Sequence, residues 1–543
     1  MKQRAENLRA LGEQEFDVLI VGGGINGAVA AAALAARGAK TALVDKADFA
    51  SETSSQSSNL VWGGIKYLES FEVPLVYNLC KSRNLLTEMY PSTVKEIRFL
   101  TAVRNNFRWP AFVVFLGAVF YWVLGGFKTE RPRYLSCKEI RALEPALNVD
   151  EARAGFEYSD CYLHDNDARF VFNFVRSALK RGAIAANYVN AQSYERTAAG
   201  WQVGIRDELT GEESVVRARV LINACGPYAD AQNEKSGITT EHRHLFSKGV
   251  HLVVDRVTPH QRILTFFASD GRPFFVIPMG AKTCVGTTDT QVTDADVGVT
   301  DEDRRFILDN VNAGLSLQRP LELSDIIAER CGVRPLAVTG GEDSDDWLQL
   351  SRKHAIDVDE DQAHISVFGG KLTDCLNVGD EIAAVVASLG VPLREPETLW
   401  YGEPSAQVKA QFVAQAAAIN LDAMTGPGIE EKLTERLWRR YGQSAFELLA
   451  KIEQDPTQAE ILISGAEYIR CELEYVARHE MITKLDDFMR RRSKISLVIS
   501  MQDIAAADGL LTACEMLFGD EAQAKLAEYF KDQGVEWTGA RVA

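Results

Sequence analysis

Three glycines near the start of the chain have the spacing of a phosphate-binding turn. Gly22, Gly24 and Gly27 form the pattern G-x-G-x-x-G. In such a turn the first glycine permits the tight bend, the second lets the backbone approach a pyrophosphate, and the third lets a helix pack closely on a strand. The amide groups at the start of that helix attract the phosphates. Asp45, about twenty residues further on, can accept hydrogen bonds from the ribose hydroxyls of an adenosine.

A second glycine turn lies far along the chain. Gly369 and Gly370 separate the apolar run ISVF from the polar run KLTD, which predicts a strand that ends on a turn and opens a helix. Because the carboxyl ends of parallel strands meet at one edge of a sheet, both turns are expected to face one ligand. Two helix N-termini suit a long dinucleotide such as FAD, with the second directed at the flavin edge that becomes negative on reduction. NAD and a purely structural turn are the alternatives.

Two cationic side chains near predicted strand ends could hold an anionic substrate. Arg334 offers a planar fork that suits phosphate or carboxylate, and Lys371 offers a point charge. The 543-residue chain has a net charge of −17, so an anion must be attracted by a local cluster of cations. A nucleic-acid partner, which would need a basic face, is not expected. Each cation could instead be a surface residue, and His251, which has apolar neighbours, could be structural.

A strand-helix-strand unit is needed to position the first glycine turn, and the sequence predicts one. Residues 16–21 are mostly apolar or β-branched, as in a buried parallel strand. The alanine-rich run 28–36 favours a helix, and residues 40–44 predict a second strand. Strand patterns that return at 220–230 and 365–374 predict further strands of the same sheet. We therefore expect an α/β (α+β) protein with a Rossmann-like FAD-binding domain.

The chain is too long for a single core, and changes in its pattern predict three domains. The expected boundaries are 16–100, 150–245 and 320–395 for a discontinuous FAD-binding domain, 101–149 and 246–319 for an antiparallel β-rich substrate domain, and 400–543 for a C-terminal helical domain.

Residues 109–127 carry no charge over nineteen positions, which is close to the length of a membrane span. Proline and glycine interrupt the run, so a buried helix and an apolar surface that dips into one leaflet are the other interpretations. Basic residues flank it, as an interfacial segment requires: Arg104, Arg108, Lys128, Arg131 and Arg133.

The remaining composition indicates an intracellular protein without a bound metal. Nine cysteines are scattered with no C-x-x-C pair, which predicts neither a zinc site nor a disulfide framework. Residues 1–15 lack the apolar core of a signal peptide. The acidic turn with Asp160, Asp165 and Asp167 does not have the spacing of a calcium loop, and helix capping by Asp165 or Asp167 explains it better.

Taken together, the motifs resemble the FAD-dependent (aerobic, membrane-associated) glycerol-3-phosphate dehydrogenases, within the D-amino-acid-oxidase-like flavoproteins. The matching segments cover nearly the whole chain: VGGGINGAVAAAALAARG, DFASETSSQSSNLVWGGIKYLE, GFEYSDC, NACGPYAD, SKGVHLVV, FVIP, VGTTDT, GVRPL, FGGKLT and the late YVARHEMITKLDDFMRRRSK. The resemblance implies bound FAD, hydride transfer from C2 of sn-glycerol 3-phosphate, dihydroxyacetone phosphate as product and a membrane quinone as acceptor. It also implies a cytoplasmic protein in peripheral contact with the inner membrane, for which a homodimer is a candidate assembly.

The candidate site follows from the motifs and the resemblance together. Arg334, Lys371 and Lys66 are expected to bind the phosphate, with Tyr67 positioning the substrate and His251 as a candidate base. The candidate cofactor-binding residues are Gly22, Gly24, Asn26, Gly27, Asp45, Lys46, Thr53, Ser54, Ser58, Asn59, Gly63, Gly64, Val189, Ala224, Gly226, Gly370, Lys371, Leu372 and Thr373.

Three departures from the family pattern keep other functions open. Trp62 stands where the family has a histidine beside the flavin, and its indole cannot accept a proton. Lys66 replaces an arginine and loses the bidentate geometry, and Asp374-Cys375-Leu376 replaces Thr-Tyr-Arg. A related flavin oxidoreductase with another hydroxy- or amino-acid substrate, or a non-catalytic flavin-binding protein, therefore remains an alternative.

Overall fold

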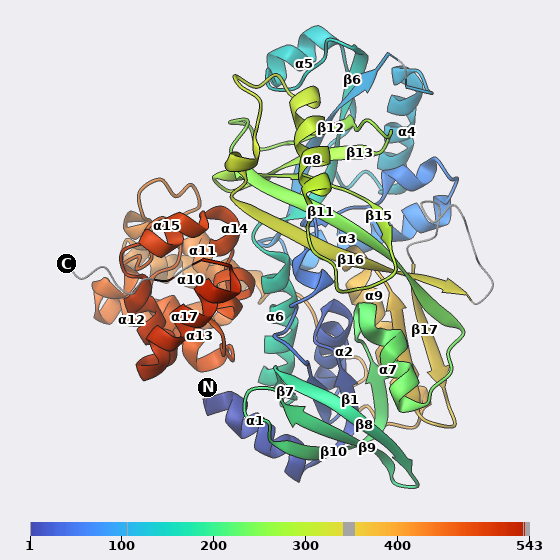
Figure 1. Ribbon diagram of the computed structural model, residues 1–543, viewed down its shortest axis with the longest axis vertical. Helices are drawn as coiled ribbons and strands as arrows, with labels where there is room; N and C mark the ends of the chain where they lie inside the picture. Colours follow the sequence, from blue (N-terminus) through green and yellow to red (C-terminus); the bar gives the residue numbers. More distant parts are fainter. Residues whose placement is uncertain (1, 106, 340–352, 536, 538–543) are drawn as a thin grey trace.

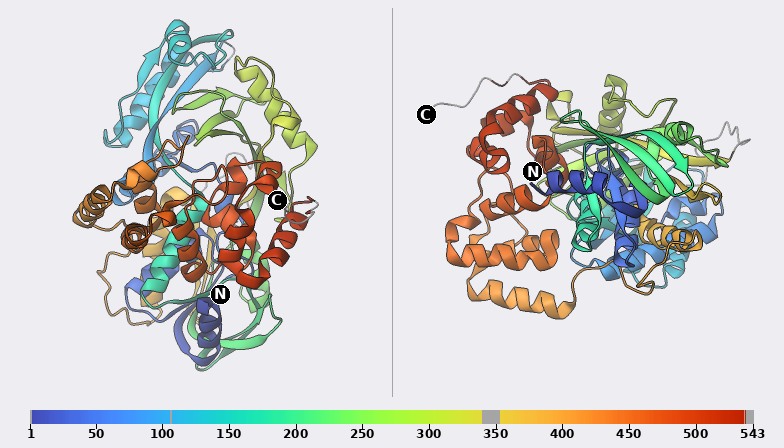
Figure 2. Two further views of the ribbon diagram at one scale, coloured as in Figure 1. Left: turned by 90° about the vertical axis from the view of Figure 1, so that its left-hand side faces the viewer. Right: turned by 90° about the horizontal axis from the view of Figure 1, so that it is seen from below.

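The computed structural model describes residues 2–105, 107–339, 353–535 and 537. Two large sheets lie one above the other in Figure 1, and the helices of the last quarter of the chain gather at one side of them. The right-hand view in Figure 2 shows the same separation of the C-terminal helices from the sheets.

The first sheet is built on the strands that the glycine turns follow. Its order is β17-β18-β10-β1-β2-β7, with β8 and β9 joined through β10. β1 is parallel to β10 and β2, and β10 is parallel to β18. The bounds are β1 Glu15–Val21, β2 Thr41–Val44, β7 Ile184–Ala186, β8 Val189–Thr197, β9 Gly200–Asp207, β10 Glu213–Asn223, β17 His354–Asp359 and β18 His364–Gly369. The two glycine turns therefore open at the same edge, as expected.

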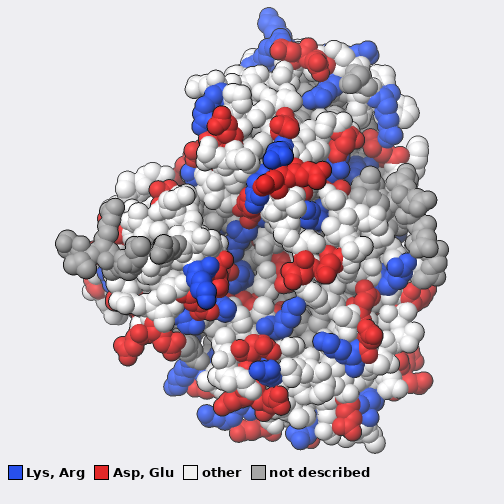
Figure 3. Space-filling model, in the orientation of Figure 1, with Lys and Arg blue, Asp and Glu red and all other residues white. Residues whose placement is uncertain are grey.

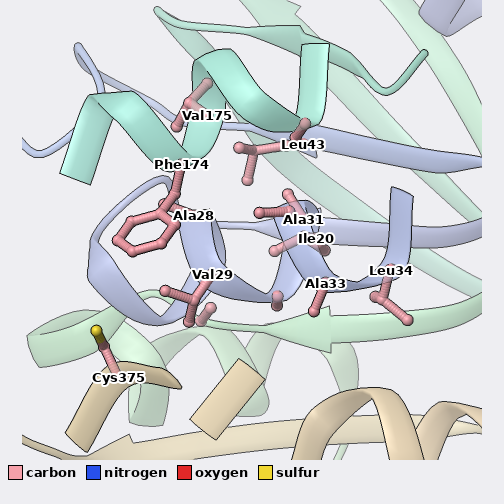
Figure 4. Packing of buried hydrophobic residues seen from close by; sticks show 14 of the residues in the cluster. Ile20, Ala28, Val29, Ala31, Ala33, Leu34, Leu43, Phe174, Val175 and Cys375 are labelled. Atoms are coloured by element: carbon pink, nitrogen blue, oxygen red, sulfur yellow. The ribbon is translucent and has the colours of Figure 1, made fainter. Parts of the chain in front are cut away.

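Helix α2 (Ile25–Ala36) is buried between the sheet and two other helices, α6 (Asp167–Lys180) and α9 (Cys375–Ser388). Figure 4 shows Ala28 and Ala31 of α2 between Ile20 of β1 and Phe174 of α6, with Cys375 of α9 on another side. Alanine side chains let these elements approach closely, and their burial favours the helix at no cost in side-chain entropy. Helices α1 (Lys2–Glu13) and α7 (Ala229–Ser236) complete this half.

The second sheet has the order β15-β11-β14-β13-β12-β4-β6-β3, with β16 beside β11 and β5 beside β6. The bounds of its strands and helices are β3 Leu60–Val61, β4 Val94–Arg104, β5 Arg133–Leu135, β6 Ala152–Leu163, β11 His242–Asp255, β12 Ile263–Phe267, β13 Pro273–Met279, β14 Lys282–Gly286, β15 Thr290–Val292, β16 Ala328–Thr339, α3 Val73–Met89, α4 Ala111–Leu124, α5 Cys137–Leu143 and α8 Asp301–Gly314.

Strand pairing departs from the domain boundaries expected from the sequence. β3, β4, β6 and β16 fall in segments expected to belong to the FAD-binding domain, yet all four pair in the second sheet. The reason is long-range pairing: β4 and β6 run antiparallel over most of their length, and β16 pairs with β11 from Ala328 to Thr339. Periodicity within a strand does not reveal which distant strand it joins.

The C-terminal part is helical, as expected, and has a hydrophobic core of its own. Its helices are α10 Ala406–Ala418, α11 Leu433–Tyr441, α12 Ala445–Gln454, α13 Arg470–His479, α14 Ile495–Val498, α15 Met501–Ala506, α16 Leu510–Phe518 and α17 Ala522–Asp532, with a π-helix at Asp487–Arg492. On the face shown in Figure 3, basic and acidic side chains are interspersed.

Buried ion pairs connect the helical part to the first half of the chain. Asp48, in the loop after β2, accepts hydrogen bonds from Arg491 Nε at 2.7 Å and from Arg492 Nη1 and Nη2 at 2.7 and 2.9 Å. Asp165 pairs in the same way with Arg439. Asp48 and Arg492 are fully buried, so each charge depends on its partner.

Helix α4 presents an apolar face to solvent. Ala111, Ala118 and Tyr121 are buried, whereas Phe112 and Leu116 are 57% and 48% exposed. The interpretation of this segment as a buried helix is therefore wrong. Within the described parts of the chain, no helix combines the length and apolar character that crossing a membrane requires.

Replacing Asp48 with Asn is expected to lower the free energy of unfolding by about 3 kcal/mol or more, because the buried guanidinium of Arg492 would lose the carboxylate that it pairs with. Arg491 would lose one carboxylate and keep Asp486 and Asp487. Burial alone would raise the pKa of Asp48, but Arg492 and Arg491 outweigh it and hold the pKa below its usual value. The contribution to stability is therefore present above about pH 4 and is lost as the pH falls through the lower pKa of the folded state.

Urea unfolding at pH 7 and at lower pH tests this expectation. Asp150→Asn is the matched control, because its pair with Arg141 is 79% and 57% exposed and should contribute less than about 1 kcal/mol. Equal effects of the two substitutions would contradict a special role for the buried cluster.

Candidate active site

Two adjoining cavities lie at the carboxyl ends of β1, β10 and β18. The first, here called the nucleotide cavity, is lined by the first glycine turn and by residues after β2 and β10. The second, the reaction cavity, encloses about 310 Å³ between the second glycine turn and the second sheet. Gly370 and Ser54 line both, so one long ligand could occupy the two together.

The first glycine turn leaves no room for side chains. A Cβ atom on Gly27 would lie 1.8 Å from the carbonyl oxygen of Gly22, and one on Gly22, where φ is +103°, would lie 2.5 Å from the oxygen of Ala224. Gly24 is the N-cap of α2 and supplies no side chain to cap it, and Ser54 Oγ accepts from Ile25 N at 2.9 Å. The start of α2 is thus open to the nucleotide cavity, which fits a pyrophosphate.

Asp45 lies at the nucleotide cavity, and its carboxylate already accepts hydrogen bonds from two backbone amides. Its Oδ2 accepts from Gly23 N at 2.6 Å and its Oδ1 from Ala47 N at 2.9 Å. Burial raises its pKa to about 7. A carboxylate has lone pairs left for ribose hydroxyls, so this residue can shape the turn and bind a ribose at once. The neighbouring Lys46 ammonium lies 3.5 Å from the ring centroid of Tyr228.

Most of the predicted residues line one of the two cavities. At the nucleotide cavity these are Gly22, Gly24, Asn26, Asp45, Lys46, Thr53, Ser54, Val189, Ala224, Gly226 and Gly370. At the reaction cavity they are Thr53, Ser54, Ser58, Lys66, Tyr67, His251, Arg334, Gly370, Lys371, Leu372 and Thr373.

Four predicted residues, all in the described part of the chain, lie outside both cavities. Gly27 packs α2 on β1, and Asn59 donates to the carbonyl of Asp165 at 3.3 Å. Gly63 and Gly64 lie behind the wall of the reaction cavity, where a Cβ atom on either would meet a tyrosine. Both glycines therefore allow close packing behind that wall.

The three predicted cations of the reaction cavity come from three separate segments. Lys66 is in the short helix Ile65–Leu68, Arg334 in β16, and Lys371 at the second glycine turn. Lys371 Nζ donates to the Tyr67 hydroxyl at 2.8 Å. The fold thus gathers three positive charges that are far apart in the sequence.

Strand β11 and the end of the β14 hairpin hold the guanidinium group of Arg334 in place. Arg334 Nη1 lies 3.3 Å from Asp289 Oδ1, and Nη2 donates to Thr287 Oγ1 at 3.1 Å. A Cβ atom on Gly249 would lie 2.2 Å from Arg334 Nη2. The guanidinium therefore needs glycine at position 249 to lie flat against the strand.

His251 lines the reaction cavity as a neutral ring. Its Nε2 lies 3.0 Å from Ser58 Oγ, and its buried Nδ1 has no hydrogen-bond partner in the described structure. Burial, with smaller effects from Arg330 and Arg334, lowers the pKa of His251 well below its usual value. The ring is available as a hydrogen-bond partner at neutral pH, but it is a weak base.

Trp62 forms part of an aromatic wall of the cavity. Its ring centroid lies 6.1 Å from that of Phe275, at an edge-on angle of 77°, and 6.4 Å from that of Tyr67. Its Nε1 donates to the Tyr158 hydroxyl at 3.4 Å. The residue that stands in place of the family's histidine therefore supplies shape and no proton acceptor.

The departure at Asp374-Cys375-Leu376 lies outside the two cavities. Asp374 accepts from Ser82 Oγ at 2.8 Å and from Asn377 Nδ2 at 2.6 Å, and it lies 3.1 Å from His354 Nδ1. Cys375 and Leu376 are buried in the core around α2. None of the three lines either cavity in the described structure.

Some residues of the reaction cavity were not among the predicted site residues. Arg272, Phe275, Thr287, Asp289 and Lys353 also line it. The segments FVIP and VGTTDT were recognised, but nothing in the local sequence showed that they face the cavity.

The acidic turn does more than the predicted capping. Asn166 is the N-cap of α6 and accepts from Ala168 N, and Asp167 Oδ1 accepts from the same amide at 2.9 Å. Asp167 also accepts from Ser57 and pairs with Arg330. Among the described residues, no group of His, Cys, Asp and Glu is arranged to hold a metal ion.

Comparisons with known proteins agree with this arrangement. The family model of the FAD dependent oxidoreductases matches residues 17–354, and that of the C-terminal domain of alpha-glycerophosphate oxidase matches residues 399–524. The aerobic glycerol-3-phosphate dehydrogenase of Bacillus subtilis (strain 168) is 31% identical over 511 residues, covering 90% of this chain and 89% of the relative. The Staphylococcus aureus (strain MRSA252) protein of the same name is 30% identical over 505 residues, covering 90% and 88%.

A solved structure extends the likeness to the fold. The glycerol-3-phosphate dehydrogenase from Bacillus halodurans complexed with FAD gives a TM-score of 0.71 at 26% identity, covering 98% of this chain and 97% of that one. The L-alpha-glycerophosphate oxidase from Mycoplasma pneumoniae, with a TM-score of 0.55 at 19% identity over 72% of this chain and 98% of that one, shares the fold.

Replacing Gly249 with Ala is expected to displace the guanidinium of Arg334 and to weaken the binding of inorganic phosphate at least tenfold. Gly298→Ala is the control, because a Cβ atom there meets nothing within 4 Å. Isothermal titration at fixed ionic strength measures the dissociation constants. Equal constants for the two variants would show that the position of Arg334 does not matter for anion binding.

Proposed function

The chain belongs to the FAD-dependent oxidoreductases, in the glycerol-3-phosphate dehydrogenase family, and on that premise we propose that it oxidises sn-glycerol 3-phosphate to dihydroxyacetone phosphate. The observation that carries the proposal is the gathering of Lys66, Arg334 and Lys371 around one cavity that adjoins a phosphate-binding turn. A phosphate ester is the kind of substrate that such a cluster of cations attracts in a chain of net charge −17.

The protein's own residues would bind and orient this substrate. The fork of Arg334 suits two phosphate oxygens, and Lys371 and Lys66 add charge without fixing direction. The Tyr67 hydroxyl accepts a hydrogen bond from Lys371 at 2.8 Å and can donate a hydrogen bond to the substrate. The neutral ring of His251 can accept a hydrogen bond from the C2 hydroxyl, and its low basicity makes solvent the final destination of that proton.

FAD, held by the nucleotide cavity and the two glycine turns, would supply the acceptor for the hydride from C2. The turn around Gly22 and the open start of α2 would hold its pyrophosphate. The turn at Gly369 and Gly370 would lie at the flavin, because Gly370 and Leu372 line the reaction cavity. The aromatic wall with Trp62 and Phe275 would keep water from the reacting carbon.

The aromatic wall also favours a second candidate. Trp62 cannot take a proton, and a wall built from Trp62 and Phe275 suits an apolar group better than a glycerol chain. The alternative is a related flavin oxidoreductase with a larger hydroxy- or amino-acid substrate. A flavin-binding protein without catalysis is the third.

Anaerobic mixing with substrates distinguishes these functions. Glycerol 3-phosphate should bleach the flavin absorbance and glycerol should not, because glycerol lacks the phosphate that the cations bind. Arg334→Ala should raise KM for glycerol 3-phosphate more than tenfold while FAD stays bound. Bleaching by another hydroxy acid or amino acid alone would select the second candidate, and a flavin that only dithionite reduces would select the third.

The acceptor and the location form a separate part of the proposal. We infer that the protein passes electrons to a quinone at the cytoplasmic face of the inner membrane. It would bind there as a peripheral membrane protein, either as a monomer or as a homodimer. The apolar face of α4 supports this inference: Phe112, Val113, Leu116, Phe120 and Val123 are all exposed. Arg108 and Lys128 flank the helix, so the face combines apolar insertion with attraction to anionic lipids.

Replacing both Phe112 and Leu116 with Ser is expected to weaken binding to phosphatidylglycerol vesicles more than tenfold. Each large apolar side chain contributes roughly 1.5–3 kcal/mol when it is buried. Leu399→Ser is the matched control, because Leu399 is 57% exposed away from α4. Vesicle co-sedimentation provides the measurement. A wild type that binds no vesicles and reduces no quinone analogue would contradict the inference and favour oxygen as acceptor.

A further inference from the structure

One buried carboxylate connects α4 to the wall of the reaction cavity. Asp160, in β6, accepts a hydrogen bond from the Tyr121 hydroxyl at 2.5 Å. Both oxygens of Asp160 also lie 3.3 Å from Gly63 N. Tyr121 is on the inner face of α4, and Gly63 follows Trp62 in the loop that leads to Lys66 and Tyr67. The carboxylate therefore bridges α4 and the loop that leads to the reaction cavity.

Arg83, in α3, completes this cluster. Its Nη1 donates to Asp160 Oδ1 at 3.2 Å and to the Tyr121 hydroxyl at 3.3 Å. Asn84 accepts from Arg83 and donates to the carbonyl of Gly125, where α4 ends. Arg83 and Asp160 are both almost fully buried. The ion pair neutralises the carboxylate, while the contacts with Tyr121 and Gly63 set the relative positions of the elements.

The loop is pressed against the tyrosine so closely that only glycine fits. A Cβ atom on Gly63 would lie 2.2 Å from the Tyr121 hydroxyl and 2.9 Å from Cys80 Sγ. Gly64 follows with φ at +79°, and the short helix with Lys66 and Tyr67 begins at the next residue. A shift of the Gly63 amide would therefore be passed on to the two side chains that line the reaction cavity.

We propose that Asp160 is a positioning residue for the reaction, which fixes Lys66 and Tyr67 by holding the amide of Gly63 and the hydroxyl of Tyr121 together. The inference rests on the proposed function, because it assigns Lys66 and Tyr67 to the anionic end of the substrate. Asp160 itself does not line the cavity and acts through the loop.

The protonation states of the cluster favour a fixed set of hydrogen bonds. Burial, reinforced by Asp160, raises the pKa of Tyr121 well above its usual value. The hydroxyl therefore stays protonated, and remains a hydrogen-bond donor, at neutral pH. A carboxylate can accept from three donors at once, which a neutral amide in its place could not do.

Tyr121→Phe tests the proposal with the smallest change, because it removes one oxygen and leaves the ion pair of Arg83 and Asp160 in place. The holoenzyme should retain FAD and its melting temperature within a few degrees. The glycerol 3-phosphate concentration for half-maximal flavin reduction should rise at least fivefold, while the limiting rate stays within twofold. Tyr194→Phe is the matched control, because its buried hydroxyl has no hydrogen-bond partner in the described structure and lies on β8.

A double-mutant cycle shows whether the effect passes through the loop. If Tyr121 acts through Lys66, then Tyr121→Phe should change the half-maximal concentration less than twofold once Lys66→Ala is present. In the Arg334→Ala protein the fivefold effect of Tyr121→Phe should persist. Arg334 is in β16, outside the loop, and the effects of substitutions at unconnected sites are additive. Additivity with Lys66→Ala, or a loss of stability without a change in the half-maximal concentration, would overturn the proposal.

Inorganic phosphate separates this proposal from the proposed reaction. Its dissociation constant, read from the flavin spectrum, needs no turnover and should show the same fivefold change and the same cycle. If glycerol 3-phosphate bleaches no variant while phosphate gives this pattern, the proposed reaction fails and the positioning role stands. A wild type that binds neither ligand overturns both.

Discussion

The binding site depends on how closely α2 lies against β1. A side chain on Gly27 would collide with the backbone of Gly22, so the contact requires glycine at position 27. Alanines extend the same closeness along the helix, with α6 and α9 packed on its flanks (Figure 4). The amide groups at the start of α2 are thereby fixed at the edge of the sheet where phosphates are best stabilised.

The reaction cavity lies between the two sheets, and both contribute residues to its lining. The first sheet brings Lys371 to it at the end of β18, and the second brings His251 and Arg334 from the long antiparallel pair β11 and β16. Lys66 reaches it from the short helix that follows β3 of the second sheet. A change in the relative position of the sheets would therefore alter the spacing of the cations before it altered either sheet.

Much of the fold could be predicted, because glycine spacing and apolar periodicity are local properties. The placement of Gly22 and Gly370 at one edge is confirmed by the parallel pairing of β1, β10 and β18. Arg272 and Asp289 could not be assigned to the cavity, because their closeness to it follows from the register of distant strands. The pairing of β4 with β6 in the second sheet could not be predicted for the same reason. The roles of the predicted site residues stay predictions.

The pairing of Asp48 with Arg492 has a consequence for the order of events during synthesis. The two residues are 444 positions apart in the sequence, and a ribosome delivers the first of them long before the second. Until Arg492 has emerged, the loop after β2 contains a carboxylate that cannot be buried without its partner. The nascent protein can therefore assemble the strands of its first sheet once β18 has emerged, but it buries the loop after β2 only when nearly the whole chain has been made.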